Sequence, residues 1–485
     1  MKGPIYGRVT FHERSLLLVA IDFLKRRLAR LAFFVHYAVA SNFTAPKKQP
    51  TNNKMKNSSY KIKFVEIFAV GCLVCGLALP AYAGKAEEGV DTLVNFTGKN
   101  GSQPQSILED SAGNFYGTTL AGGTDGKGTV FVIEQNGKLV TLVNFTGPNG
   151  SAPEAGLLLG PDGSLYGTTK TGGKGNTGTL FKISPDGKFS LLTSFTGANG
   201  AQPDSGLFFG PDGNIYGATQ TGGTDDKGTV FKISPDGKLT TIISFNGKNG
   251  ANPGSLAEGD NGNFFGTCRS DDAGKGSVFK IGPDGKLVTL VVFNGTNGAS
   301  PVSGIVRADD GNFYGTTTDG GKSNFGTVYK ITPDGVLTTI VSFDGINGSH
   351  PNSGLVEWVN GYFYMTSLWK NMLVKSAGVE WSGDNFCGTT SSGGAHGNGT
   401  VFKASSDGNL VTLVEFTGSQ GLNLGTSPNC LVAGQDGNLY GTTGSGGIDS
   451  QGTVFRLQLQ LWLPPSGGES EGGAAGSFYI PIVSR

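Results

Sequence analysis

Residues 114–119 read NFYGTT, and closely similar strings recur six more times along the chain. Their central positions are Tyr116, Tyr166, Tyr216, Phe265, Tyr314, Cys387 and Tyr440. A second string of the type GTVF follows each copy and begins at Gly128, Gly178, Gly228, Gly276, Gly326, Gly399 and Gly452. The period is close to 50 residues, with one interval of 73. Seven copies of one unit at this period predict a repeat architecture.

Each unit contains four strand-like runs separated by turn signals. In the third unit the runs are residues 206–210, 214–219, 228–234 and 238–245. The sequence Pro-Asp-Gly separates the first run from the second and the third from the fourth, and this tripeptide favours a tight turn. Four antiparallel strands in about 50 residues match the size of one β-propeller blade.

The two ends of the repeat region predict how the ring closes. The last unit has its third strand at 452–457 but no turn and no fourth strand after it. Residues 90–96 (VDTLVNF) match fourth strands such as 139–145 (LVTLVNF). We therefore predict an all-β, seven-bladed propeller in residues 84–462, closed by one N-terminal plus three C-terminal strands, because closure removes free sheet edges. An open solenoid is the alternative.

The composition agrees with many short strands joined by tight turns. The 485 residues include 82 Gly, 21 Pro, 31 Phe and 13 Tyr, and only 15% are charged. Coiled coils, collagen and disordered charged tails have other compositions and are excluded. Residues 84–485 carry 24 basic and 34 acidic side chains, a net charge of −10. This charge argues against nucleic acid as a partner, since nucleic-acid binders present a basic surface to phosphates.

Some positions inside the repeated strings are expected to be structural. Gly117 and its six counterparts are glycine in every copy, which predicts close packing of the inner strands. Cys268 and Cys387 occupy positions that hold Thr and Tyr in other copies. We expect these cysteines to be buried substitutes, since their spacing fits neither a zinc site nor a disulfide framework.

The sequence before the repeats has the features of a targeting segment. Residues 55–83 combine three lysines, an apolar stretch at 67–79 and the small residues of AYA at 81–83. This arrangement predicts a secretory signal peptide, with a membrane anchor as the alternative. The mature chain is then secreted, periplasmic or held in the cell envelope, with no membrane span. We interpret residues 1–54 as a non-native or disordered extension and 463–485 as a flexible Gly/Ser-rich tail.

The long interval between two copies contains an insertion near 359–381. Residues 353–367 align without gaps to 376–390 and share Val-Glu-Trp with them, which indicates a local duplication. Three of the four Trp lie in or beside the insertion, at Trp358, Trp369 and Trp381. Their side chains either anchor a partner or stack on a sugar, or they pack a widened sixth blade.

The repeated pattern DGNxYGTT, GG, GTVFKI and PDG resembles the GloVer tandem repeat of "choice-of-anchor" extracellular bacterial proteins. The resemblance covers about residues 90–457 and recurs in all seven units. It implies a secreted or surface repeat protein with a propeller-like array. It implies no established activity.

Two kinds of loop share one face of such a propeller: those that join the fourth strand to the next first strand, and those between the second and third strands. The second kind varies most between copies, and variable loops on a fixed frame are where a site is expected. The candidate binding residues on this face and in the insertion are Asp125, Asp225, Asp226, Asp271, Asp272, His350, His396 and Trp369.

Each of these candidates has a plainer interpretation beside the functional one. His350 and His396 lie on loops of the same face, so a catalytic or metal-binding pair is weighed against two solvated histidines. The Asp pairs at 225–226 and 271–272 offer weak calcium binding, whereas aspartate in a turn is commonly explained by hydrogen bonds to its own backbone.

The sequence gives architecture more readily than activity. It contains no nucleotide-binding loop, zinc-protease motif or nucleophile elbow, and we expect no cofactor and no metal. We favour a monomeric secreted or envelope protein that binds a protein or polysaccharide or serves a structural role. The alternative is a propeller-type lyase or hydrolase that acts on extracellular glycans through carboxylates on the loops.

Overall fold

The computed structural model describes residues 90–234, 237–359, 362–364, 373–375 and 384–459. The chain divides into two compact units, Met1–Lys85 and Ala86–Arg485, and every described residue belongs to the second. The proposed extension, signal peptide and C-terminal tail lie outside the described residues, as does Trp369. Helical structure in the described part is limited to one short 3-10 turn, η1 (Asp260–Gly262).

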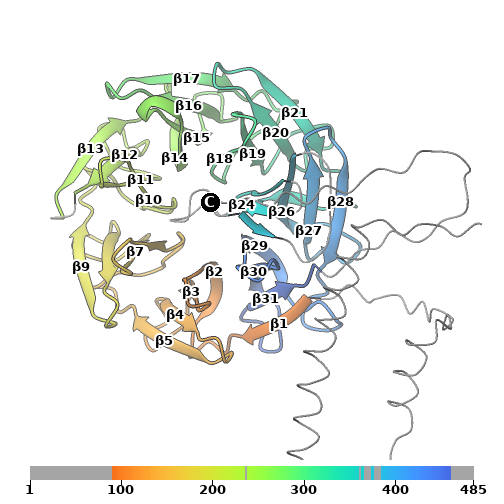
Figure 1. Cartoon of the computed structure of the whole chain (residues 1–485). Coiled ribbons are helices and arrows are strands. Elements are labelled where there is room, and N and C mark those ends of the chain that lie inside the picture. The colour runs from red at the N-terminus through yellow and green to blue at the C-terminus, as the bar shows by residue number, and fades with distance from the viewer. Residues whose placement is uncertain (1–89, 235–236, 360–361, 365–372, 376–383, 460–485) are drawn as a thin grey trace, which may run out of the picture. The chain divides into compact units, whose positions relative to one another are not determined.

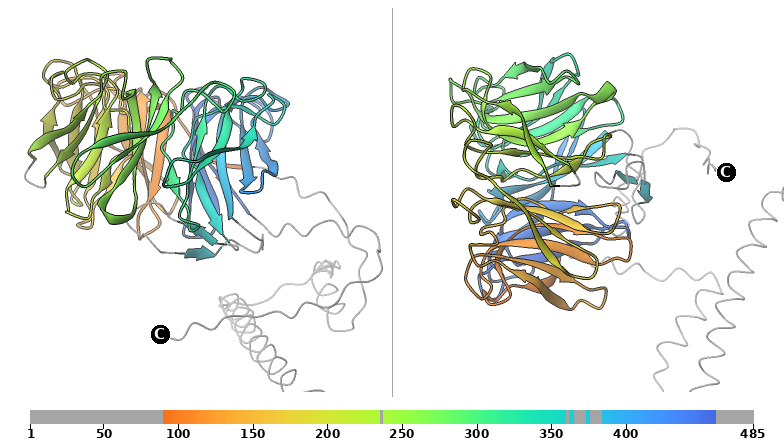
Figure 2. Two further views of the ribbon diagram at one scale, coloured as in Figure 1. Left: turned by 90° about the horizontal axis from the view of Figure 1, so that it is seen from above. Right: turned by 90° about the vertical axis from the view of Figure 1, so that its left-hand side faces the viewer.

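Seven antiparallel sheets stand around a common axis as the blades of a propeller (Figures 1 and 2). The strands of each blade are given from the innermost outward. Blade one has β2 (Ser102–Glu109), β3 (Phe115–Ala121), β4 (Thr129–Ile133) and β5 (Leu139–Asn144). Blade two has β6 (Leu158–Leu159), β7 (Leu165–Thr169), β8 (Thr179–Ile183) and β9 (Phe189–Ser194). Blade three has β10 (Phe208–Phe209), β11 (Ile215–Thr219), β12 (Thr229–Ile233) and β13 (Leu239–Ser244).

The remaining blades follow the same order, with blade six enlarged. Blade four has β14 (Ala251–Glu258), β15 (Phe264–Ser270), β16 (Ser277–Ile281) and β17 (Leu287–Val292). Blade five has β18 (Val306–Arg307), β19 (Phe313–Thr317), β20 (Thr327–Ile331) and β21 (Leu337–Ser342). Blade six has β25 (Leu373–Lys375), β24 (Tyr362–Tyr364), β23 (Val356–Val359), β26 (Asp384–Ser392), β27 (Thr400–Ser405) and β28 (Leu410–Glu415), and β22 (Ser349–Pro351) pairs with β26 beside this series. Blade seven has β29 (Thr426–Ala433), β30 (Leu439–Ser445), β31 (Thr453–Leu457) and β1 (Val90–Asn95).

Blade seven confirms the predicted closure of the ring. Strand β1 pairs antiparallel with β31, in a register that runs from Val90 opposite Leu457 to Asn95 opposite Thr453. The carboxylate of Asp91 also lies 2.7 Å from the guanidinium of Arg456 across this pair. One N-terminal and three C-terminal strands therefore share one sheet, and the ring has no open end.

The insertion extends blade six toward the middle of the ring (Figure 1). The first copy of the duplicated segment supplies the inner strand β23, and the second copy supplies β26, with Val356 opposite Cys387. Strands β24 and β25 then add to the free edge of β23. Trp358 is almost completely buried in this blade, so its side chain serves packing. Trp381 lies outside the described residues.

Blades are apolar on both faces because each face packs against a neighbour. All five residues of β4 are buried, for example. At every junction between blades, a Phe after the outermost strand meets an aromatic ring of the third strand in the next blade. The pairs are Phe96–Phe131, Phe145–Phe181, Phe195–Phe231, Phe245–Phe279, Phe293–Tyr329, Phe343–Phe402 and Phe416–Phe455, with ring centroids 5.1–5.4 Å apart.

The glycine inside each second strand makes room for that same ring. Gly117 lies directly opposite Phe131, and a Cβ on Gly117 would stand 2.5 Å from Phe131 Cζ and 2.4 Å from the carbonyl oxygen of Ser106. The expected close packing is therefore present, and an aromatic side chain of the neighbouring strand is its main cause. Cys268 and Cys387 are both fully buried, as the repeat positions indicated.

A second set of contacts joins every pair of neighbouring blades, which we call the seams. The connection into every blade contains a proline at the same repeat position: Pro104, Pro153, Pro203, Pro253, Pro301, Pro351 and Pro428. The residue before each of these prolines has φ of 52–55°, and its N–H donates to a carbonyl in the preceding blade at 2.8–3.0 Å. The donors and acceptors are Gln103–Gln451, Ala152–Lys127, Gln202–Thr177, Asn252–Lys227, Ser300–Lys275, His350–Phe325 and Ser427–Asn398. The glycine that opens each third strand contacts the proline of the next blade, as Gly228 does with Pro253.

Blade five differs from the others in the aromatic pairs at the blade junctions, because Tyr329 in its third strand stands where the other blades have Phe. The side chain is completely buried and the hydroxyl has no hydrogen-bond partner among the described residues, and burial raises the pKa of Tyr329 well above its usual value. A buried unsatisfied polar group costs about 1–3 kcal/mol.

We therefore expect Tyr329→Phe to stabilise the protein by about 1 kcal/mol, since it removes only the unsatisfied hydroxyl. Urea denaturation followed by circular dichroism measures the change. Tyr314→Phe is the matched control and should destabilise, because the Tyr314 hydroxyl donates to Asp310 at 2.9 Å. Equal losses of stability in both variants would contradict the assignment.

Candidate functional site

The two ends of the blades form unlike faces. The loop face is made of the loops between second and third strands and the connections between successive blades. The turn face carries the short turns between first and second and between third and fourth strands. In every blade except the enlarged blade six the first strand is innermost, and it runs from the loop face to the turn face, so residues at its start lie nearest the axis on the loop face (Figure 1).

Two of the predicted aspartates hold their own loops. Asp226 accepts a hydrogen bond from the N–H of Gly222 at 2.7 Å. Asp271 accepts from the N–H of Lys275 at 2.9 Å. The remaining three, Asp125, Asp225 and Asp272, are exposed on the loop face. Within the described ranges, no three His, Cys, Asp or Glu side chains come together in a group that could hold a metal ion.

The two histidines occupy different settings on the loop face. His350 is a seam residue; its Nδ1 lies 3.2 Å from Ser392 Oγ and its Nε2 lies 3.9 Å from Asp319 Oδ1. His396 is exposed in the loop between β26 and β27. No hydrogen bond or ion pair joins these two histidines, both of which the structure describes. The geometry therefore gives His350 a seam environment of its own, separate from His396.

Trp369 lies outside the described residues, but the strands on either side of it show where the insertion leaves the blade. Val359, the last residue of β23, is opposite Asp384, the first residue of β26. This is the end of the sheet at the turn face. The insertion therefore starts and ends at the turn face, away from the loops that carry the other candidates.

The residue after each repeated proline begins the innermost part of its blade, and these seven residues form what we call the inner rim. They differ from blade to blade: Gln105, Glu154, Asp204, Gly254, Val302, Asn352 and Asn429. None of these seven residues was among the predicted candidates, although an invariant proline precedes the position in every copy. Variation here, beside an otherwise repeated frame, was the available signal.

The two charged residues of the inner rim, Glu154 and Asp204, each pair with a cation at the end of a second strand. Lys170 Nζ lies 2.7 Å from Glu154 Oε2, and both side chains are about one quarter to one third exposed. Arg269 of blade four reaches across the seam, with Nη2 3.2 Å from Asp204 Oδ2 of blade three. We call these four residues the charged quartet.

Asp204 is the most buried member of the charged quartet. Its side chain is 1% exposed, and neither carboxylate oxygen has a hydrogen-bond donor of suitable geometry among the described residues. Burial raises the pKa of Asp204, while Arg269 acts in the opposite direction; Glu154 and Lys170 are close enough to contribute as well. The four charges thus form one electrostatic group across three blades.

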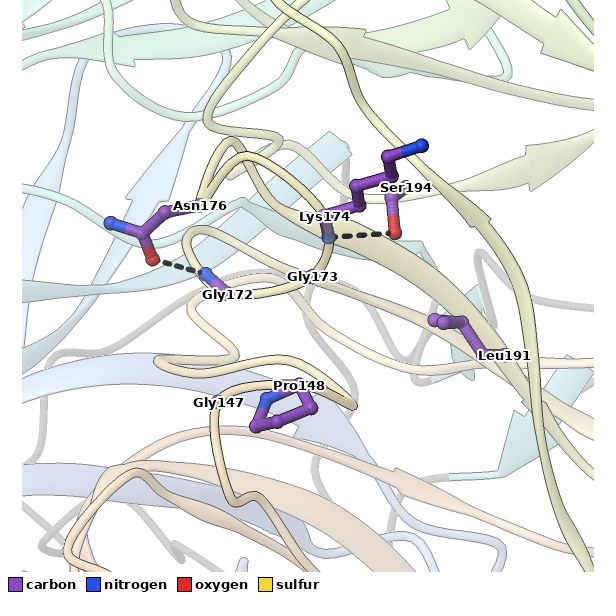
Figure 3. A pocket seen from close by; sticks show the side chains of 8 residues that line it. All are labelled: Gly147, Pro148, Gly172, Gly173, Lys174, Asn176, Leu191 and Ser194. Carbon is purple, nitrogen blue, oxygen red and sulfur yellow. Dashed lines mark hydrogen bonds between the residues drawn. The ribbon is translucent and has the colours of Figure 1, made fainter.

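A shallow pocket of about 460 Å³ lies on the loop face of blade two (Figure 3). Its lining consists of Gly147, Pro148, Gly172, Gly173, Lys174, Asn176, Leu191 and Ser194. Asn176 Oδ1 accepts from the N–H of Gly172 at 2.9 Å, which holds one wall. Leu191 is 44% exposed, and the corresponding residue is threonine in the other blades, as at Thr141 and Thr241. Leu191 therefore gives this pocket an apolar wall at a position where the other blades have threonine.

The turn face is more uniform than the loop face. In three blades a tyrosine hydroxyl donates to an aspartate of the first turn at 2.7–2.9 Å: Tyr216 to Asp212, Tyr314 to Asp310 and Tyr440 to Asp436. A second pocket of about 590 Å³ lies here in blade one, beside Tyr116 and Glu134. Repetition of the Tyr–Asp contact indicates a structural role.

Two glutamates on the turn face join blades through backbone hydrogen bonds. Glu109 accepts from the N–H of Gln435 at 2.7 Å, and Glu357 accepts from the N–H of Asp309 at 3.0 Å. Burial is the first cause that raises the pKa of each to about 7, and nearby aspartates add to it. Both carboxyl groups therefore keep their protons at pH values at which a free glutamate has lost them.

These raised pKa values predict how stability depends on pH. The folded protein holds protons on these two groups that the unfolded chain releases near pH 4.5, so their contribution to stability is greatest below that value and declines as the pH rises to about 7. After allowance for solvent screening, the two groups together account for about 2 kcal/mol. We expect E109Q/E357Q to flatten this decline in urea denaturation at pH 4.5 and 7.5. Parallel pH curves for the variant and the wild type would contradict the assignment.

Comparison with known proteins agrees with the repeat and the fold. The sequence profile of the Gloeobacter/Verrucomicrobia repeat matches residues 82–274 and 186–370. No curated protein matches the sequence. None of the described helical structure has the length and hydrophobicity of a membrane-crossing helix.

Among solved structures, an extracellular domain from B. thetaiotaomicron, assigned to a one-component system, superposes with a TM-score of 0.50 at 10% identity, over 76% of this chain and 40% of that one. A catalytically inactive virginiamycin B lyase from Staphylococcus aureus, solved with quinupristin, gives 0.49 at 13% identity, over 76% and 98%. The selenomethionine form of that lyase gives 0.47 at 13% identity, over 75% and 97%. At these identities the likeness concerns the fold alone.

Proposed function

The chain belongs to the Gloeobacter/Verrucomicrobia repeat family, and on that premise we propose that it is a secreted or envelope-held propeller whose loop face binds a protein or polysaccharide partner without chemical turnover. The proposal uses the ring as a rigid frame and the loop face as the variable part. Residues 55–83 supply the export signal in this proposal.

One observation carries the proposal: the contacts between blades are the same at every seam, whereas the residues of the inner rim differ from blade to blade. The seam hydrogen bonds recur at 2.8–3.0 Å in all seven junctions. The inner rim, at the same height in the blades, holds amide, acidic, small and apolar residues in turn. Positions that serve only the fold keep one residue type in a repeat array, whereas a site grafted on the fold needs different groups at different places.

The charges of the inner rim suit binding. Glu154 and Asp204 each have a cation within 3.2 Å. Paired charges remain in place as fixed hydrogen-bonding groups, which orient a polar partner. A general acid or base instead exchanges a proton with its substrate during each turnover.

The test is binding by the secreted protein. The full chain is expressed with its own N-terminal region, recovered from the medium and applied to a glycan array and to envelope extracts of the same bacterium. In one variant the loops at 172–177 and 222–227 are replaced by the six residues of 122–127. In the matched control, the turns at 184–188 and 282–286 are replaced by the five residues of 134–138.

We expect the loop variant to lose the partner and the turn variant to keep it. Loss of binding in the turn variant alone would contradict the assignment of the loop face. Turnover of an arrayed polymer would favour the lyase or hydrolase alternative. Retention of the protein in the cytoplasm would contradict the export signal.

A further inference from the structure

We infer that the charged quartet is a subsite for the hydroxyl groups of a neutral saccharide. This inference rests on the proposed function and names a ligand class and residues for it. The quartet combines Glu154 and Lys170 of blade two with Asp204 of blade three and Arg269 of blade four. All four lie where the innermost strands begin or the second strands end, so they lie at the loop-face end of blades two to four.

The exposure of the four side chains divides their roles. Glu154, Lys170 and Arg269 are 31%, 26% and 28% exposed, so a ligand on the loop face reaches them. Asp204 is 1% exposed, and its Oδ2 lies 3.2 Å from Nη2 of Arg269. Asp204 is therefore a positioning residue, which fixes the direction of the guanidinium across the seam between blades three and four.

The quartet has open hydrogen-bonding capacity. Arg269 Nε is buried and has no acceptor among the described residues, and neither oxygen of Asp204 has a donor. Arginine carries five N–H donors in a fixed plane, and a carboxylate offers about four acceptor positions. The unused positions of this buried ion pair suit a water molecule that both donates and accepts, whereas a ligand reaches the partly exposed side chains of Glu154, Lys170 and Arg269.

Charge balance selects the class of ligand. The two cations and two anions of the quartet cancel, so an anionic or cationic ligand finds no uncompensated charge there. A hydroxyl group accepts from a guanidinium or ammonium and donates to a carboxylate at the same time, without separating either ion pair. Neighbouring hydroxyl groups of a neutral sugar therefore match alternating donors and acceptors better than a charged ligand does.

The other blades do not repeat this arrangement. Blade four has Gly254 on the inner rim, and blade five has Val302, while Arg269 at the end of β15 has Gln220 as its counterpart in blade three. The seam contacts of these blades are nevertheless the same as those elsewhere. The ion pair between Asp204 and Arg269 is therefore additional to the contacts that build the ring.

The experiment uses the full chain, with binding measured by calorimetry. The probes are neutral gluco-, manno- and galacto-oligosaccharides, with uronic-acid and amino-sugar oligosaccharides of equal length. One variant is Arg269→Gln. A second, E154Q/K170Q, changes only partly exposed side chains and so preserves the fold. The control, Lys286→Gln, removes the cation of an exposed ion pair on the turn face, where Nζ lies 3.6 Å from Asp284. Thermal unfolding checks that all variants are folded.

We expect a neutral oligosaccharide to bind the wild type with little change between low and 0.5 M salt, because salt screens interactions between charges and the ligand carries none. Arg269→Gln and E154Q/K170Q should each weaken this binding more than about tenfold, as loss of a charged hydrogen bond does. Lys286→Gln should bind as the wild type does.

The outcomes separate this inference from the proposed function. Saccharide binding that survives both quartet variants but is lost when the loops at 172–177 and 222–227 are exchanged overturns the quartet and keeps the loop face. Binding only to charged oligosaccharides, with strong salt dependence, overturns the neutral ligand. A protein partner without any saccharide binding also overturns the inference and leaves the proposed function in place. No partner of either kind overturns both.

Discussion

Replacing Gly228 with alanine is expected to destabilise the protein by about 4 kcal/mol, the sum of backbone strain and overpacking. Gly228 opens the third strand of blade three with φ of +98°, a conformation that costs other residues about 1–2 kcal/mol. A Cβ at this position would also stand 2.4 Å from the carbonyl oxygen of Thr219 and 2.5 Å from Pro253 Cδ. Both groups belong to packed backbone or a proline ring, so neither moves easily.

The control for Gly228→Ala is Gly187→Ala. Gly187 has φ of +82°, but a Cβ there meets no atom within 4 Å, so this variant reports strain alone. We expect it to lose about 1 kcal/mol. Urea denaturation followed by far-ultraviolet circular dichroism measures both. Equal losses would mean that the seam has room for a methyl group and that the glycine is needed only for its backbone angle.

Replacing Phe96 with alanine is expected to cost about 4 kcal/mol, typical of a large buried aromatic side chain. Phe96 follows β1 and is completely buried, with its ring centroid 5.2 Å from that of Phe131 in blade one. Of the seven aromatic pairs at the blade junctions, the pair Phe96–Phe131 is the one that links the N-terminal strand to the next blade. The loss therefore reports on the closure of the ring as well as on packing.

Two comparisons make the Phe96 result interpretable. Phe245→Ala removes the matching side chain at the junction of blades three and four, where the centroid distance to Phe279 is 5.3 Å. Phe96→Leu keeps most of the volume and should cost only about 1 kcal/mol. If Phe96→Ala proves far milder than Phe245→Ala, strand β1 does not hold the ring closed in solution.

The fold could be predicted from the sequence because short local strings specify the strands of each blade, and these strings recur in seven copies. The string at 114–119 identifies a strand, and its repetition identifies the blade. Residues 90–96 resemble a fourth strand closely enough to predict their pairing with residues 453–457, although more than 350 residues separate them. Each inference needed only a comparison of one copy with another.

The candidate site was less accessible to this reasoning. Asp226 and Asp271 looked like ligands, but each caps its own loop, a hydrogen bond that depends on backbone geometry. The pair between Asp204 and Arg269 joins different blades and depends on how far one side chain reaches across a seam. A comparison of copies shows that such positions vary, but it does not show which of them meet.

The pairing of β1 with β31 also sets how the ring responds to a pulling force. Val90 and Leu457, the outer ends of these two strands, lie opposite each other, so tension applied through both ends of the chain loads one hydrogen bond at a time. Strands opened in this way separate like a zipper, whereas strands loaded along their length would share the force among all their bonds. We therefore expect blade seven to open first under tension, at a force well below that needed to break the other blades.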